Sequence, residues 1–293
     1  MSDEEDESNK GSGNNVNATI DAVTGLMKAV PVYQDTVQPA AKELGKSLEI
    51  VARAVNVALM PLKGLVWSFE QIEKRFIPKL VGSLKDVPLE DIIPPKPNVA
   101  GPAIEALRYT GHEESLSDMY ANLLAAAMNV KRAGGAHPAF VEIIKQLTSD
   151  EAKLMKFFVT QELAFPLITV KAVDKEGGGA HWELAVNVSL LGEAAGVDLI
   201  KFTPSYLDNL SRLGLIELKR NWSYTENGLY SELENSSKVA RLRKVVEMEH
   251  VRIFEVDRGA VALTNFGEQF GDICILGIEA PETAAEDSRN ATS

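Results

Sequence analysis

Three helix-start signals follow one another between residues 115 and 151, and this succession constrains the fold more than any other feature. Ser115 and Asp118 have the S-x-x-D spacing of a capping box, and Thr148 and Glu151 repeat that spacing with glutamate. Pro138, between them, suits the first turn of a helix. The first predicted helix carries apolar residues at i, i+3, i+4, i+7, i+8 and i+11, which form one buried stripe: Leu116, Met119, Tyr120, Leu123, Leu124 and Ala127. The block therefore predicts three consecutive helices packed by apolar faces.

Apolar residues at helical spacing also dominate the chain before this block. Their 3.6-residue period predicts a long helix at 35–59 and a second at 62–80. The segment 88–97 holds four of the thirteen prolines and predicts an ordered linker, which leads into a short helix at 102–110. The N-terminal half is therefore predicted to be all helical.

The pattern changes after residue 161 to β-rich segments that alternate with short helices. Thr203 and Pro204 predict a capped helix start, and Thr264 predicts another near the end of the chain. Glycine-rich turns separate the strands of two predicted hairpins. In chain order the predicted elements are strands at 165–173 and 181–188 around Gly177–Gly179, helices at 189–195 and from 203, a strand at 215–220, a polar segment, a helix at 237–249, strands at 251–256 and 260–263 around Asp257–Gly259, and a last helix.

This order of elements is typical of a winged helix-turn-helix. The fold class predicted is mainly α with a small β component, in which an α-helical N-terminal domain precedes a winged-helix-like α+β domain. The long hairpin at 165–186 and the insertion at 222–250 depart from the usual pattern. The predicted boundaries are a disordered acidic tail at 1–18, a helical domain at 19–147, a winged-helix-like domain at 148–276 and a disordered tail at 277–293.

Composition indicates a cytoplasmic protein without a membrane span. Hydrophobic residues make up 45% of the chain, enough for a full core. The single cysteine, Cys274, cannot form an internal disulfide and fits a reducing compartment. The N-terminus is acidic and lacks the apolar region of a signal peptide. Ala54–Leu62, the longest strongly apolar run, is far shorter than the roughly 20 residues of a spanning helix.

No motif of catalysis or cofactor binding occurs in the sequence. The four histidines lack the spacing of a metal site, and P-loop, dinucleotide-binding and nucleophile-elbow motifs are absent. We therefore expect a protein that is not an enzyme and has no catalytic residue, cofactor or metal. Its action would then depend on contacts with a partner.

Contacts with a partner are predicted from the helix that begins at 203 and from the last predicted hairpin. The residues expected to make them are Lys201, Ser205, Tyr206, Asn209, Arg212, Arg252 and Arg258. DNA is one candidate partner, yet the chain has a net charge of -12, and nucleic-acid binders are usually basic. A protein partner is the preferred interpretation. Contact of the helices within 35–80 with a membrane surface is a third.

Several runs in the chain resemble the abortive-infection alpha (Abi-alpha) family of bacteria. They are M-Y-A-N-L-L-A-A-A-M at 119–128, H-P-A-F-V-E-I-I-K-Q-L at 137–147, S-D-E-A-K-L at 149–154 and L-T-N-F-G-E-Q-F at 263–270. The resemblance implies a role in defence against bacteriophage, in which an infected cell stops growing or dies. The preferred hypothesis is non-enzymatic binding to a phage or host component. A DNA-binding transcriptional regulator and a membrane-perturbing effector remain the alternatives.

Overall fold

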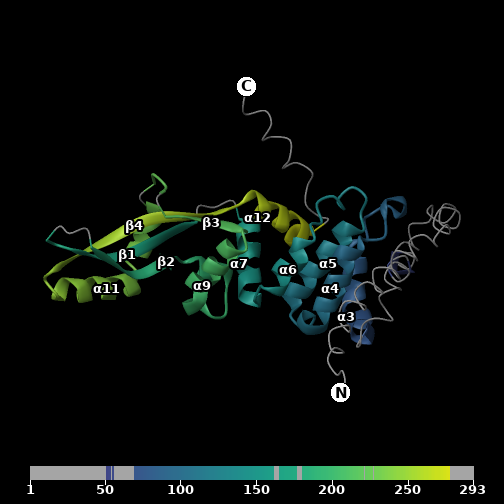
Figure 1. Ribbon diagram of the computed structural model, residues 1–293, viewed down its shortest axis with the longest axis horizontal. Coiled ribbons are helices and arrows are strands. Elements are labelled where there is room, and N and C mark those ends of the chain that lie inside the picture. The colour runs from purple at the N-terminus through teal and green to yellow at the C-terminus, as the bar shows by residue number, and fades with distance from the viewer. Residues whose placement is uncertain are drawn as a thin grey trace, which may run out of the picture. The chain divides into compact units, whose positions relative to one another are not determined.

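A computed structural model describes residues 51–53, 55, 69–161, 165–176, 180–220, 222–226 and 228–277 of the chain, and Figure 1 shows its elements. The chain divides into two compact units. Unit 1 is formed by residues 1–146 with 276–293, and unit 2 by residues 147–275. Helices dominate and one small antiparallel sheet accompanies them, so the predicted mainly α class with a small β component is confirmed.

Several predictions fall wholly or largely on residues outside this description. They are the two tails, the turn at Gly177–Gly179 and most of the helix at 35–59, of which residues 51–53 and 55 are helical.

Unit 1 is a group of helices packed around α5. Its elements are α3 (Phe69–Ser83), the 3₁₀ turn η2 (Leu89–Asp91), α4 (Pro97–Thr110), α5 (Glu114–Ala127) and α6 (Ala139–Lys145). Helix α5 contacts α3, α4 and α6. Every residue of its predicted apolar stripe is buried, which confirms that prediction. Tyr120 is fully buried, and its hydroxyl donates to the carbonyl of Val141 at 3.4 Å.

The predicted capping box of Ser115 and Asp118 is wrong. Helix α5 starts at Glu114, its N-cap is Glu113, and no side chain caps it. Asp118 instead forms an ion pair with Lys79 of α3 at 2.5 Å, so a contact between helices takes the carboxylate that the sequence pattern assigned to the helix start.

The proline-rich segment before α4 is ordered, as predicted, because its backbone pairs with the end of α5. The N–H of Ile93 donates to the carbonyl of Met128 at 2.8 Å, and that of Val130 donates to Asp91 at 2.9 Å. Helix α4 begins at Pro97, five residues before the predicted start at residue 102. Proline at a first helical position costs no hydrogen bond, which explains the earlier start.

Unit 2 combines short helices with a four-stranded sheet. In chain order it contains α7 (Ser149–Thr160), β1 (Pro166–Asp174), β2 (His181–Val188), α8 (Leu191–Ala195), the 3₁₀ turn η3 (Ile200–Phe202), α9 (Thr203–Arg212), β3 (Ile216–Lys219), α10 (Gly228–Glu234), α11 (Ser237–Met248), β4 (Arg252–Leu263), α12 (Asn265–Phe270) and the π-helix η4 (Gly271–Leu276). The last residue of η4, Leu276, belongs to unit 1. The predicted capping box at the start of α7 is confirmed: Thr148 Oγ1 accepts the N–H of Glu151, and the Glu151 carboxylate accepts the N–H of Thr148. Thr264 caps α12 as predicted.

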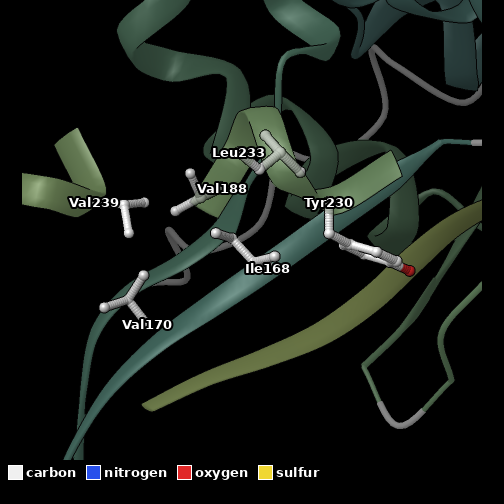
Figure 2. Packing of buried hydrophobic residues seen from close by; sticks show 6 residues of the cluster. All are labelled: Ile168, Val170, Val188, Tyr230, Leu233 and Val239. Carbon is white, nitrogen blue, oxygen red and sulfur yellow. The ribbon is translucent and has the colours of Figure 1, made fainter. Parts of the chain in front are cut away.

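The sheet has the strand order β2-β1-β4-β3, and each neighbouring pair is antiparallel. One of its faces is covered by α10 and α11, which contact β1. Figure 2 shows Ile168 of β1 toward Tyr230 and Leu233 of α10, and Val170 farther along the same strand. Val188 of β2 and Val239 of α11 complete this cluster of buried residues. The Tyr230 hydroxyl donates to the Gly259 carbonyl at 2.9 Å, which fixes α10 on the sheet.

The hairpin predicted around Asp257–Gly259 is wrong, because β4 continues through these residues without a turn. Its residues 257–259 pair with Leu167, Ile168 and Thr169 of β1. A Cβ at Gly259 would lie 2.8 Å from both Leu167 Cδ1 and the Lys219 carbonyl oxygen. Glycine therefore permits close packing between strands here, and the sequence pattern presented it as a turn residue.

Two further predictions about unit 2 need correction. Thr203 does not cap α9: it is the first helical residue, and its hydroxyl donates to the Ile200 carbonyl at 2.7 Å. The predicted polar segment before α11 contains the helix α10. Only Tyr230 and Leu233 of α10 are buried, so its apolar signal is too short to stand out in the sequence.

Substitution of Gly267 tests the packing of α12 against Leu215, the residue before β3. A Cβ at this position would lie 1.9 Å from the backbone oxygen of Leu215, which cannot move as a side chain can. We expect Gly267→Ala to lower the free energy of unfolding by about 3 kcal/mol. Urea unfolding followed by circular dichroism measures this change. Gly228→Ala is the control, because nothing lies within 4 Å of a Cβ there. Equal stability of the two variants would contradict the packing described.

Candidate partner-contact surface

Helix α9 is held against α7 by two polar side chains that the sequence assigned to partner contact. The Tyr206 hydroxyl donates to Asp150 Oδ2 at 3.1 Å, and Asn209 Nδ2 donates to Glu151 Oε1 at 2.7 Å. Both carboxylates belong to the first turn of α7 and are buried. Tyr206 and Asn209 thus serve in the structure to fix the position of α9.

Asp150 organises the segment that precedes α9. Its carboxylate accepts the backbone N–H of Asp198 at 2.8 Å and of Leu199 at 3.0 Å, besides the Tyr206 hydroxyl. Lys153 lies 3.4 Å from the same carboxylate. Burial acts to raise the pKa of Asp150, but these donors stabilise the ionised form and together lower its pKa below the ordinary value.

The segment fixed by Asp150 exposes three large apolar side chains. We define the 199–202 loop as Leu199, Ile200, Lys201 and Phe202, which includes η3. Leu199 is 51% exposed, Ile200 45% and Phe202 43%. Lys201 Nζ lies 4.9 Å from the centre of the Phe202 ring. Apolar side chains that are held in place and exposed together are characteristic of a surface used for protein contact.

The outward side of α9 continues this surface with polar groups. Ser205 and Arg212, two of the residues predicted to contact a partner, are exposed. The guanidinium of Arg212 donates to Asn209 Oδ1 from Nε at 3.0 Å and from Nη2 at 2.6 Å. Arg212 is therefore oriented by the residue that joins α9 to α7. The 199–202 loop with Ser205 and Arg212 makes up what we call the α9 surface.

The two arginines predicted on the last hairpin lie on β4 and belong to a different cluster. Arg258 forms a two-pronged ion pair with Glu234 of α10, at 2.6 Å from Nε and 3.1 Å from Nη2. The hydrogen bond to Glu234 raises the pKa of Arg258. Arg252 pairs with Glu249 at 2.7 Å and stacks 4.2 Å from the ring centre of Trp182. These contacts join β4 to the helices and strand beside it.

The 199–202 loop was missed by reasoning from sequence, except for Lys201. The run L-I-K-F before Pro204 looks like any short buried segment, and only the tertiary contacts of Asp150 turn it outward. In the parts of the chain that the structure describes, no group of three or more histidine, cysteine, aspartate or glutamate side chains could hold a metal ion. No helix within those same parts has the length and apolarity needed to cross a membrane.

Comparison with known proteins identifies the family of the chain. The pattern of the family described as abortive infection alpha matches residues 68–274, which include nearly all of unit 2 and, in unit 1, residues 68–146. The chain belongs to the abortive infection alpha family. In this member, the family match includes the whole α9 surface and both arginines of β4. The resemblance predicted from the sequence is confirmed.

Comparisons with curated proteins and with solved structures add no functional information. No curated protein matches this abortive infection alpha protein. A solved structure of an uncharacterized protein from the hydrocarbon-degrading marine bacterium Alcanivorax borkumensis SK2 is similar to it at 23% identity. That similarity covers 48% of this chain and 94% of the other, with a TM-score of 0.33, which is too low to support a statement about fold or function.

The carboxylate of Asp150 makes the stability of unit 2 depend on pH. Its pKa is lowered in the folded protein, so the stabilisation is complete well above the ordinary value of 3.8 and is lost as the pH falls through the folded pKa. We expect Asp150→Asn to cost about 2 kcal/mol of unfolding free energy at pH 7 and progressively less below pH ~4. Urea unfolding at several pH values measures this.

The control for this experiment is Asp198→Asn. The Asp198 side chain is 79% exposed and its ion pair with Lys153 is on the surface, so we expect a change below about 0.5 kcal/mol. A cost for Asp150→Asn that stays constant from pH 7 to pH 3 would contradict the role given to the ionised carboxylate.

Proposed function

We propose that this protein acts in abortive-infection defence by binding a phage or host protein through the α9 surface. Family membership supports the defence role. The observation that carries the proposed mechanism is the 199–202 loop, in which three large apolar side chains are exposed while the backbone behind them is anchored to Asp150. A surface fixed before binding loses less conformational entropy on association than a mobile one.

We further propose that unit 2 is a variant of the winged helix. Supporting this, α7, α8 and α9 are followed by β3 and β4, which pair with each other, and β1 between α7 and α8 also pairs with β4. The insertion of α10 and α11 between β3 and β4 enlarges the wing. In this proposal α9 occupies the place of the recognition helix and contacts protein.

Contact of α9 with protein has more support than contact with DNA. The polar side chains Tyr206 and Asn209, which would reach base edges, donate instead to the carboxylates of α7. Arg258 is committed to Glu234. DNA binding normally needs several cations directed at phosphates, and the exposed apolar loop contributes none beyond Lys201.

The proposed action needs no catalysis by this chain and takes place in the cytoplasm. The sequence lacks the motifs of known catalytic sites, and a single buried cysteine fits a reducing compartment. In this proposal, defence follows because binding changes the activity of the partner or of unit 1.

Phage challenge of a sensitive bacterial strain that expresses the full chain tests this proposal. We expect the variant Leu199→Ser, Ile200→Ser, Phe202→Ser to lose protection, so that the efficiency of plating approaches that of cells without the gene. Exposed apolar anchors often contribute 2 kcal/mol or more to binding, about a 30-fold change in affinity each. Efficiency of plating and survival of infected cells are the measurements.

The matched control removes three exposed apolar side chains from unit 1, with Tyr109→Ser, Val130→Ser and Leu276→Ser. It should protect as the natural chain does, and both variants should accumulate to the same level. Full protection by the loop variant, or equal loss in both variants, would refute the assignment of partner contact to the α9 surface.

A further inference from the structure

Helix α11 carries a row of cations and aliphatic residues on its outer side. The row consists of Lys238, Arg241, Lys244, Val245 and Met248, whose spacing places them along one side of a helix. All five are exposed. We call this row the α11 stripe. Glu247, the only acidic residue of α11, lies beside the stripe and not within it.

The packing of α11 fixes the direction of the stripe. Its opposite side buries Val239 and Val246, and Val239 belongs to the cluster that joins α11 to β1. Arg243, on the same side of the helix as Val239 and Val246, lies 4.4 Å from the ring centre of Phe254 on β4. The Ser236 side chain caps the helix by accepting the N–H of Val239. The stripe therefore faces away from the sheet that Figure 1 shows against α11.

The cations of the stripe are not neutralised by neighbours. Within the described residues, Lys238, Arg241 and Lys244 form no ion pair with a carboxylate. This contrasts with Arg252 and Arg258 nearby, each of which is paired with a glutamate. The whole chain has a net charge of -12, so three unpaired cations on one helix form a local exception. Such a site attracts an anionic partner.

The C-terminal end of the stripe is apolar to an unusual degree. Met248 is 77% exposed and Val245 57%. Val251, just before β4, and Ile253, within it, are exposed as well. Aliphatic side chains neither stack on nucleic-acid bases nor bind phosphate, so they favour a partner that offers an apolar layer beside its negative charge.

We propose that the α11 stripe docks unit 2 on the anionic surface of a lipid bilayer. Its three cations contact the headgroups, and its aliphatic end enters the boundary between headgroups and acyl chains. This proposal concerns a different surface from the 199–202 loop and does not depend on it. It also differs from the membrane contact considered for residues 35–80, because it rests on α11 alone.

Flotation of the full chain with lipid vesicles tests the proposal. Vesicles of phosphatidylcholine with phosphatidylglycerol should carry the protein at low salt, and vesicles of phosphatidylcholine alone should carry little. Lys238→Glu, Arg241→Glu, Lys244→Glu should lower partitioning on the order of 100-fold, since each cation near an anionic surface contributes about a factor of five. Val245→Ser with Met248→Ser should also weaken binding, and high salt should weaken binding of the natural chain.

The matched control is Lys96→Glu, Arg108→Glu, Lys156→Glu, which changes the net charge equally at exposed positions outside the stripe. It should float as the natural chain does, and so should the serine variant of the 199–202 loop. Absence of flotation with anionic vesicles, or an equal loss in the control, would overturn the proposal. A stripe-dependent shift of duplex DNA without vesicle binding would overturn it in favour of nucleic acid.

Discussion

The arrangement of unit 2 depends on the hydrogen bonds that the Asp150 carboxylate accepts. The carboxylate lies in the first turn of α7, yet it accepts N–H groups from residues 198 and 199 and the hydroxyl of Tyr206. The first turn of α7 and the stretch 198–206, distant in sequence, are thereby joined at one buried charge. Its ionised form is stable only because these donors are in place, since an unpaired buried carboxylate would be neutralised or would destabilise the fold. The exposed 199–202 loop is a consequence of this anchoring.

The second constraint is the long antiparallel pairing of β1 with β4, which continues from Pro166 to Asp174 of β1. Because β4 runs unbroken for twelve residues, it offers a platform wide enough for α10 and α11. The ion pair of Glu234 with Arg258 and the hydrogen bond of the Tyr230 hydroxyl attach that layer to β4. The inserted helices therefore form a supported surface with its own charge, separate from the α9 surface.

Much of the fold could be predicted from local patterns, but only part of the site could. Lys201, Ser205 and Arg212 were expected in it, and the apolar side chains of the 199–202 loop were not. The stripe of α5, the Thr148–Glu151 capping box and the β1–β2 hairpin all follow from spacing that neighbouring residues impose on one another. The turn expected at Asp257–Gly259 failed because strand pairing with β1 outweighs a local turn preference. Tyr206 and Asn209 were expected to point outward, and carboxylates on α7 hold them instead. Such contacts join residues about 56 to 58 positions apart, which no local pattern reports.

The sequence by itself indicated the family, the helical character of unit 1 and most of the elements of unit 2 apart from α10 and the unbroken β4, because periodicity and caps act over a few residues. Only the tertiary structure decided which polar side chains are used internally and which remain for a partner. Burial and pairing depend on what other segments bring alongside, so Arg258 is taken by Glu234 while Lys238, Arg241 and Lys244 stay exposed. The same reason turns Leu199, Ile200 and Phe202, apolar residues that composition assigns to a core, into surface.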